Sequence, residues 1–294
     1  MRKWVINFFC LLLLMLLSSC STGGLSNDNL ITEEFKIPGS FKGNSGTYIA
    51  NLDAEVIRPN DGLRHPLAVI NHGTNGHNVA ARFPNEMRGM ALEFVRRGWV
   101  VVLFTRRGFG RSEGVYEEGI TGHTADVYEQ AGRAASSDIR EAILYMEKKS
   151  YVNAAQVISV GESTGGFATV ALTVHPPPGL VAAINFAGGR GSFVKGSDSL
   201  HTVYNEPAEI EAFQRYGKKS RIPMLWVYAE NDSVFAPALV RQFYAAFTEA
   251  GGKAELIEAP AWGSDGHDFF RYSTDWIKYV DDFLMKQNLT DKQN

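Results

Sequence analysis

Cysteine is scarce in this 294-residue chain, which contains only Cys10 and Cys20. Two cysteines cannot supply the disulfide framework of a small secreted domain, so packing must stabilise the fold. No stretch after the first 20 residues is apolar enough to span a bilayer. Excess positive charge is also lacking, because 29 Lys and Arg residues face 32 Asp and Glu residues. The sequence therefore gives no reason to expect a nucleic-acid partner.

The N-terminus has the pattern of an export signal. Arg2 and Lys3 precede an apolar run at residues 4–17 that is too short to cross a bilayer as a mature helix. The run ends in Leu-Ser-Ser-Cys, which resembles the lipobox of bacterial lipoproteins. That resemblance implies that residues 1–19 are a cleaved signal peptide and that Cys20 becomes the lipidated first residue. An ordinary secretory signal with an incidental cysteine is the alternative.

Lipid on Cys20 predicts where the protein resides. Two or more acyl chains, palmitate among them, give stable membrane attachment without a transmembrane helix. We therefore expect a lipoprotein anchored in the bacterial cell envelope and facing the periplasm. Ser21 follows the cysteine, which in enterobacterial lipoproteins implies sorting to the outer membrane. The polar residues 20–34 suit a flexible tether, and residues 35–294 are expected to form one domain.

Short apolar runs rich in β-branched residues alternate with helical patterns, after an early extended segment at residues 48–57. This alternation predicts an α/β fold with a mostly parallel sheet flanked by helices. The strand candidates are residues 67–71, 100–104, 157–160, 181–185, 224–228 and 254–257. The helix candidates are residues 84–97, 134–149, 166–175, 237–250 and 274–287.

Two long stretches, residues 108–136 and 188–222, show neither a strand nor a helix period. Both follow strands, so both should lie at the carboxyl edge of the sheet, where open α/β folds bind ligands. We expect them to form pocket walls, with a small cap at residues 188–222. Their aromatic side chains suggest a partly apolar pocket, although packing within a cap would use the same residues. These side chains are Phe109, Tyr116, Tyr128, Phe193, Tyr204, Phe213 and Tyr216.

Two segments fit the pattern Gly-x-Ser-x-Gly, one at Ser112 and one at Ser163. The pattern indicates a nucleophile only where a strand turns sharply into a helix. Ser163 follows the strand candidate 157–160 and precedes small and apolar residues that suit a helix packed on the sheet. Ser112 is followed by Glu-Gly-Val-Tyr-Glu, which does not begin a helix. We therefore predict that Ser163 is the nucleophile and that Ser112 lies in a structural turn.

A serine hydroxyl needs a base to take its proton, and the base needs a third group to orient it. Histidine comes last of the three in this type of fold, and three histidines follow Ser163. His175 would end the nucleophile's own helix and point away, and His201 lies in the expected cap. His267 lies in a glycine-rich loop after the last strand, from which it can reach over the sheet edge. We predict that His267 is the base.

The acid that orients the base should follow the strand candidate 224–228. Asp232 is our prediction. Glu230 is its main rival, but Glu230 lies too close to the end of the strand to be preferred. Asp265 and Asp268 are so near the histidine in sequence that they are expected to shape its loop instead. The residues predicted for catalysis are therefore Ser163, His267 and Asp232.

Acyl transfer also needs backbone N–H donors that face the developing oxyanion. One should belong to Thr164, which directly follows the nucleophile, and the other to the loop after the strand 67–71. In that His-Gly-Thr-Asn-Gly loop the candidates are Thr74 and then Asn75. His72 is expected to structure the loop and is not assigned as a base.

With these motifs in place, the chain resembles the α/β-hydrolase superfamily, in the neighbourhood of dienelactone-hydrolase-like and acyl-peptidase-like members. The resemblance spans about residues 47–287 and implies the same fold. Dienelactone hydrolases proper use cysteine as the nucleophile, so Ser163 points to esterase or peptidase chemistry. The resemblance is carried by Asn71-His72-Gly73, Arg107-Gly108-Phe109-Gly110-Arg111-Ser112-Glu113-Gly114, Gly161-Glu162-Ser163-Thr164-Gly165-Gly166 and the loops of Asp232 and His267.

The function expected from the sequence is a serine hydrolase that cleaves carboxylic esters through an acyl-enzyme on Ser163. The substrate would be a small ester or a short peptide, and no metal or organic cofactor is required. A periplasmic serine peptidase or amidase is the enzymatic alternative. A lipoprotein that uses the same fold only for binding is the alternative of another class.

Overall fold

The computed structural model describes residues 29–43, 46–74, 84–193, 200–203 and 205–290. The expected signal peptide, Cys20 and most of the expected tether lie outside the described residues. Within the described part, no helix combines the length and the apolar character needed to cross a membrane.

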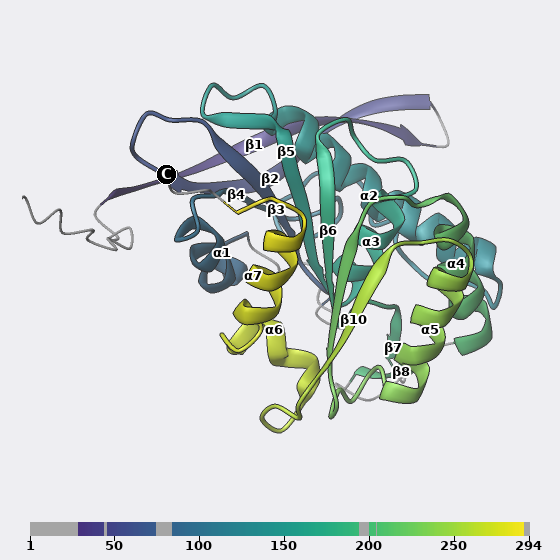
Figure 1. Cartoon of the computed structure of the whole chain (residues 1–294). Helices are drawn as coiled ribbons and strands as arrows, with labels where there is room; N and C mark the ends of the chain where they lie inside the picture. Colours follow the sequence, from purple (N-terminus) through teal and green to yellow (C-terminus); the bar gives the residue numbers. More distant parts are fainter. Residues whose placement is uncertain (1–28, 44–45, 75–83, 194–199, 204, 291–294) are drawn as a thin grey trace, which may run out of the picture.

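An eight-stranded mixed sheet forms the centre of the molecule (Figure 1). Its strand order is β1-β2-β4-β3-β5-β6-β9-β10. Strand β2 runs antiparallel to both neighbours, and the strands from β4 to β10 run parallel to one another. The strands are β1 (Leu30–Gly43), β2 (Gly46–Pro59), β3 (His65–Asn71), β4 (Val100–Phe104), β5 (Val152–Glu162), β6 (Leu180–Phe186), β9 (Met224–Ala229) and β10 (Ala254–Ala259).

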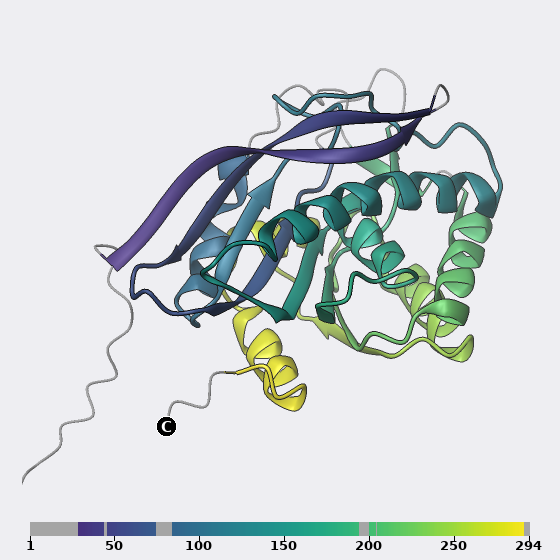
Figure 2. The same ribbon diagram turned by 90° about the horizontal axis from the view of Figure 1, so that it is seen from above.

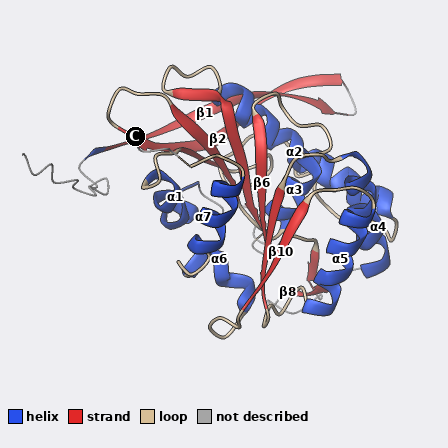
Figure 3. Cartoon of the chain, viewed as in Figure 1, coloured by secondary structure: helices blue, strands red, loops and turns tan. Residues whose placement is uncertain are grey.

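Helices cover both faces of this sheet (Figure 3). Helices α1, α6 and α7 lie on one face, and α2, α3, α4 and α5 lie on the other. The helices are α1 (Arg88–Val95), α2 (Ala125–Met146), α3 (Thr164–Leu172), α4 (Glu206–Lys219), α5 (Pro237–Glu249), α6 (Phe269–Tyr272) and α7 (Ile277–Lys286), with short 3₁₀ turns η3 (Pro84–Met87) and η4 (Gly266–Asp268). The expected mostly parallel α/β fold is confirmed.

Strand β3 explains how a continuous apolar run fills two hydrophobic layers. Successive side chains of a strand point to opposite faces of the sheet. Ala68 and Ile70 pack under α1 and α7, whereas Leu67 and Val69 pack under α2. A strand covered on both faces therefore needs apolar residues at every position.

The expectation that residues 108–136 are irregular was wrong for their second half. Helix α2 begins at Ala125 and continues for 22 residues. Its buried face uses small residues such as Ala131 and Gly132, whose weak hydrophobicity conceals the helical period in the sequence. Gly132 is required there, because a Cβ atom would lie 2.2 Å from the hydroxyl of Tyr216.

The expected cap at residues 188–222 is largely replaced by helix α4. This helix belongs to the layer formed with α2 and α5, and it begins where the side chain of Asn205 accepts a hydrogen bond from the Ala208 N–H. What lies near the carboxyl edge is the short antiparallel pair β7 (Gly191–Phe193) and β8 (Leu200–Val203) (Figure 1). Phe213 and Tyr216 are buried in the helical layer, and Phe109 and Tyr128 are fully buried as well.

The start of the folded domain also differs from the expectation. Strand β1 begins at Leu30, so residues 30–34 belong to the sheet and not to the expected tether. Strands β1 and β2 pair along 14 residues each and form a long ribbon at one edge of the sheet (Figure 2). Charged residues such as Glu33 and Glu34 on this edge strand hid it in the sequence, because edge strands tolerate polar side chains.

Candidate active site

Ser163 occupies the sharp turn between β5 and α3. Its backbone has φ 54° and ψ −121°, a left-handed φ that a residue with a side chain rarely adopts. Strain of this kind persists only where the surroundings enforce it. Ser163 is buried, with 4% of its surface exposed, so its hydroxyl meets protein groups instead of bulk water.

The two glycines of the motif permit this turn. A Cβ atom at Gly161 would lie 2.1 Å from the carbonyl oxygen of Gly165. A Cβ atom at Gly165 would lie 2.5 Å from the carbonyl oxygens of Asn71 and His72. Backbone atoms at these distances cannot move aside, so both positions require glycine.

His267 lies beside the serine hydroxyl. Its Nε2 is 3.1 Å from the Oγ of Ser163, and its Nδ1 is 3.1 Å from both carboxylate oxygens of Asp232. This geometry places a proton on Nδ1, donated to the carboxylate, and leaves Nε2 free to accept the serine proton. The structure therefore brings together the three side chains predicted for catalysis.

Asp232 is held in place by backbone hydrogen bonds. Its Oδ1 accepts hydrogen bonds from the N–H groups of Val234 and Phe235, each at 2.9 Å. The rival acid, Glu230, is exposed at the end of β9 and its backbone N–H pairs with Ala259. The hydrogen-bonded partner of the histidine is thus Asp232.

Asp265 fastens the two loops that carry His267 and Asp232. Its carboxylate accepts hydrogen bonds from the N–H of His267 at 2.9 Å and from the N–H and hydroxyl of Ser233 at 3.1 and 2.6 Å. Because Ser233 is adjacent to Asp232, one side chain fixes the spacing of base and acid. This agrees with the loop-shaping role expected for Asp265.

Two opposing effects act on the pKa of His267. Burial of the imidazole opposes its positive charge, whereas the hydrogen bond and negative charge of Asp232 favour it, with smaller contributions from Glu162 and Asp265. The favourable effects prevail and raise the pKa above the ordinary value of 6.5. Three carboxylates thus favour the protonated form of this imidazole.

The loop after β3 lies against the nucleophile. A Cβ atom at Gly73 would be 3.0 Å from the Cβ of Ser163, and the hydroxyl oxygens of Thr74 and Thr164 are 2.8 Å apart. Thr164 is also the first residue of α3, where backbone N–H groups lack partners within the helix. Thr74 and Thr164 thus lie together beside the serine, whereas Asn75 lies outside the described residues.

Two other histidines considered in the sequence, His72 and His175, do not contact the serine hydroxyl. The Nε2 of His72 accepts the N–H of Arg106 at 3.1 Å, and its Nδ1 lies 2.7 Å from the carbonyl oxygen of Gly73. His175 is exposed after the end of α3. The backbone of His201 pairs in β8, and its side chain lies outside the described part.

An ion pair between a buried carboxylate and a half-buried arginine lies next to Ser163 and was not predicted. Glu162 is 1% exposed, and its Oε2 accepts a hydrogen bond from Arg271 at 2.7 Å. Arg271 lies in α6, directly after the histidine loop. The only signal was the charge at the variable position before Ser163, which the pattern Gly-x-Ser-x-Gly does not weigh.

The sheet order, the strand-to-helix turn at Ser163 and the order of the Ser163, Asp232 and His267 loops define an α/β-hydrolase, which confirms the resemblance seen in the sequence. The sequence model of the X-Pro dipeptidyl-peptidase family (S15 family) matches residues 46–196. The chain belongs to this family and is a hydrolase. The matched region contains the nucleophile loop but ends before Asp232. A search of curated proteins found no significant match.

Solved structures with different activities share this fold. A protein assigned as a dienelactone hydrolase in Klebsiella pneumoniae is 16% identical, with a TM-score of 0.57 over 90% of this chain and 99% of its own. An esterase from Pyrococcus furiosus is 14% identical, with a TM-score of 0.57 over 87% of this chain and 93% of its own. The acylaminoacyl peptidase of Pyrococcus horikoshii is 17% identical, with a TM-score of 0.59 over 88% of this chain and 42% of its own. At such identities the similarity establishes the fold alone.

Proposed function

We propose that the chain is a serine hydrolase that cleaves carboxylic esters through an acyl-enzyme on Ser163. The observation that carries this proposal is the continuous hydrogen-bonded line from Ser163 through His267 to Asp232, with 3.1 Å at each step. A hydroxyl aligned with a neutral imidazole, itself oriented by a buried carboxylate, is the arrangement that activates serine.

The proposed reaction has two halves. In the first, the Nε2 of His267 takes the Ser163 proton while Oγ attacks the substrate carbonyl, and the same proton then passes to the leaving alcohol. In the second, His267 takes a proton from the water that attacks the acyl-enzyme, and this proton then passes to the Oγ of Ser163 as the acid leaves. The N–H groups of Thr164 and of Thr74 or Asn75 are the proposed donors to the oxyanion.

An amide or peptide substrate is the second candidate. Membership of the X-Pro dipeptidyl-peptidase family supports it, because that name describes cleavage after proline at the second position of a peptide. Its chemistry differs in one respect: the histidine must protonate an amine, which is a poorer leaving group than an alcohol. A ligand-binding lipoprotein without catalysis is disfavoured by the complete serine, base and acid set.

Labelling with a fluorophosphonate probe tests the proposal. The probe should attach to the wild-type chain and to Ser112→Ala, and it should fail to attach to Ser163→Ala. Labelling that survives Ser163→Ala would overturn the assignment of the nucleophile. Absence of labelling in the wild-type chain would favour the binding function.

A substrate panel then separates the two enzymatic candidates. p-Nitrophenyl esters of increasing acyl length represent the ester class, and p-nitroanilides of X-Pro dipeptides represent the peptide class. We expect kcat/KM for the best ester to exceed that for every anilide. A preference for an X-Pro anilide would identify the chain as a peptidase.

We further propose that Cys20 carries the lipid that holds the enzyme at the bacterial envelope, facing the periplasm. The support is the short apolar segment that ends in Leu-Ser-Ser-Cys. Radiolabelled palmitate should enter the wild-type protein and not Cys20→Ala. Equal incorporation of palmitate in both proteins would contradict the assignment of Cys20 as the lipidated residue.

A further inference from the structure

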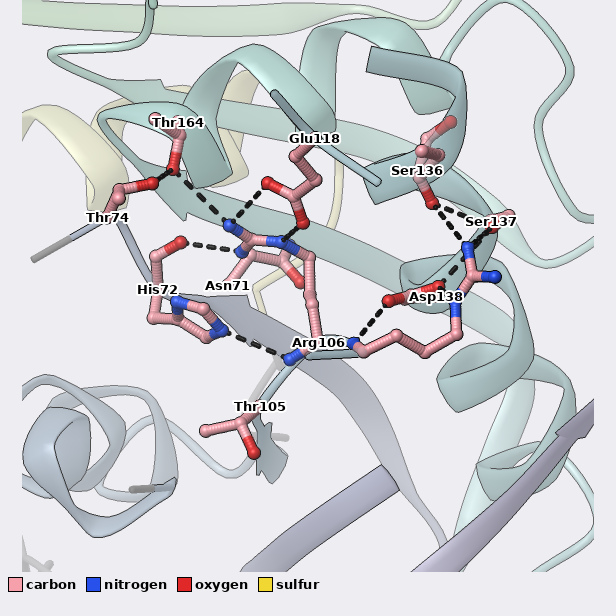
Figure 4. Close-up of polar contacts among 12 residues, drawn as sticks. Asn71, His72, Thr74, Thr105, Arg106, Glu118, Ser136, Ser137, Asp138 and Thr164 are labelled. Carbon is pink, nitrogen blue, oxygen red and sulfur yellow. Dashed lines mark hydrogen bonds and ion pairs between the residues drawn. The ribbon is translucent and has the colours of Figure 1, made fainter. Parts of the chain in front are cut away.

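A buried arginine lies behind the loops that are proposed to bind the oxyanion. Arg106 is the second residue after β4 and has no exposed surface. Its guanidinium donates to the carbonyl oxygen of His72 at 2.6 Å and to the hydroxyl of Thr164 at 3.3 Å (Figure 4). Its backbone N–H donates to the imidazole of His72 at 3.1 Å. One residue therefore contacts both loops from which the oxyanion donors are expected.

Glu118 fixes the orientation of this arginine. Its two carboxylate oxygens accept from Nε and Nη2 of Arg106, at 2.5 and 3.1 Å (Figure 4). This is the bidentate geometry that holds a guanidinium most rigidly. Glu118 is itself only 2% exposed, so neither partner can exchange this contact for water.

A second arginine extends the cluster to the loop after β6. Arg190 donates to the Glu118 carboxylate at 3.3 Å and also to its carbonyl oxygen. The preceding residue, Gly189, donates its N–H to the carbonyl oxygen of Ser163 at 3.2 Å. The Arg106–Glu118–Arg190 cluster thus joins three loops that surround the nucleophile.

The cluster carries one more positive than negative charge. Arg106 and Arg190 are cationic, and Glu118 supplies a single carboxylate between them. Glu209 accepts the N–H of Arg190 at 2.6 Å, and burial raises the pKa of Glu209 well above its ordinary value, which weakens its contribution of negative charge beside the cluster. An uncompensated buried charge is costly until an opposite charge arrives nearby. A tetrahedral oxyanion at Ser163 is such a charge.

We propose that Arg106 is a positioning residue that holds the His72–Thr74 loop and Thr164 in register for oxyanion binding. We also propose that the net positive charge of the Arg106–Glu118–Arg190 cluster favours the transition state over the bound substrate. This inference rests on the proposed serine acyl transfer. Because the cluster acts when the oxyanion forms, its loss should reduce kcat and leave KM nearly unchanged.

Arg107 provides a matched control one residue further along the chain. It is also buried, at 4% exposed, and it is paired with a buried carboxylate, because its Nε donates to Asp138 at 2.7 Å. Its other contacts go to the ring of Phe41 in β1, to the hydroxyls of Tyr48 in β2 at 2.9 Å and of Ser137 in α2 at 3.0 Å, and to the carboxylate of Glu117 at 3.3 Å. Substitution of Arg107 therefore disturbs a buried ion pair of the same kind without touching the oxyanion loops.

The test compares the full-length variants Arg106→Met, Arg106→Lys and Arg107→Met with the wild-type chain. Active sites are counted with a fluorophosphonate, and kcat and KM for a p-nitrophenyl ester are expressed per active site. An aryl boronic acid, which forms a tetrahedral adduct with serine, reports affinity for a transition-state-like species.

We expect Arg106→Met to lower kcat by about 100-fold, a loss comparable to that of one oxyanion donor, with KM within threefold of wild type. Boronate affinity should fall in the same proportion. Arg106→Lys should lose about tenfold, since an ammonium keeps the charge but cannot bridge both loops. If Arg106→Met does not fold, Arg106→Lys carries the test alone. Arg107→Met should keep both kcat and boronate affinity within threefold.

Two failures can be told apart. If the wild-type chain does not label at Ser163, the proposed function fails and this inference fails with it. If labelling is normal but the Arg106 variants turn over ester and bind boronate like Arg107→Met, the positioning role alone is wrong.

Discussion

Ser163 and Ser112 lie in loops with the same five-residue pattern, and both loops follow a parallel strand of the central sheet. The hydroxyl of Ser163 faces an imidazole 3.1 Å away. The hydroxyl of Ser112 instead donates to the carbonyl oxygen of Thr105 at 2.5 Å and accepts the N–H of Asp53 at 2.8 Å. Ser163 therefore has a partner that can remove its proton, whereas the hydroxyl of Ser112 links β2 to the loop after β4.

The backbone explains why one pattern serves two purposes. At Ser163 the serine itself takes the positive φ, which raises its side chain at the tip of the turn. In the other loop Gly110 and Gly114 take positive φ values of 54° and 91°, and Ser112 does not. The glycines of the pattern thus indicate a tight turn in both loops. Only where the serine itself has the positive φ does its hydroxyl face an imidazole instead of backbone groups.

The largest expected difference between the loops is in turnover. Ser163→Ala should reduce kcat for a p-nitrophenyl ester by about 10⁵-fold or more, because loss of a nucleophile removes the covalent route entirely. Ser112→Ala should keep kcat/KM within twofold and lower the free energy of unfolding by about 1 kcal/mol, the contribution of a typical hydrogen bond. Steady-state kinetics and urea unfolding measure the two effects. A large loss of kcat/KM in Ser112→Ala would contradict the structural role assigned to Ser112.

The second difference lies in the carboxylate near each serine. Asp232→Asn should lower kcat by about 10⁴-fold, because an amide no longer favours the histidine tautomer that accepts the serine proton. Asp53 is equally buried beside Ser112 and binds Arg111 at 2.8 Å. Asp53→Asn should leave kcat within twofold while lowering stability. Comparable kinetic losses in the two variants would contradict the assignment of Asp232.

The third difference is in the cost of a methyl group. Gly165→Ala places a Cβ atom 2.5 Å from two backbone carbonyl oxygens, so we expect a loss of about 3 kcal/mol in the free energy of unfolding. In Gly114→Ala the new Cβ atom meets the side chain of Arg107 at 3.2 Å, which can shift slightly. We therefore expect the free energy of unfolding to fall only by the cost of a positive φ, about 1–2 kcal/mol. Urea unfolding of both variants measures the difference. Equal losses would show that the Ser163 turn relaxes more readily than its contacts suggest.

The smallest effect concerns the pH at which the Ser163 loop works. Protonated His267 cannot accept a proton, so activity is lost as the pH falls through its pKa. Because that pKa is raised, the acidic limb of kcat/KM should have its midpoint above 6.5. Glu162→Gln removes one of the negative charges responsible and should move the midpoint down, whereas Ser112→Ala should leave it unchanged. A wild-type midpoint at or below 6.5 would contradict this prediction.

The sequence predicted the buried parts of the fold better than its edges. Strand β4 was predicted with its observed bounds, 100–104, because a strand covered on both faces is apolar throughout. Strand β1 was missed because its outer positions carry charge, and the start of α2 was missed because its buried positions are Ala and Gly. Both failures have one cause: small or polar residues can occupy regular structure without leaving a hydrophobic period.

The candidate site shows the same limit in another form. The chain order of Ser163, Asp232 and His267 was sufficient to nominate them, because the fold fixes where each loop emerges. The Arg106–Glu118–Arg190 cluster was not predicted, because its members are far apart in sequence and each resembles an ordinary surface charge. Only the packing shows that Arg106 is completely buried and shared between two loops.

Together with the proposed lipid on Cys20, the early start of β1 would limit how far the folded domain can lie from a membrane. With lipid on Cys20, only ten peptide steps separate the anchor from Leu30, where the sheet begins. A fully extended chain of that length spans at most about 35 Å. The near end of the folded domain would then lie within about 35 Å of the bilayer. Esters that partition into the membrane surface would meet it by two-dimensional search, and dilute soluble esters would meet it far less often.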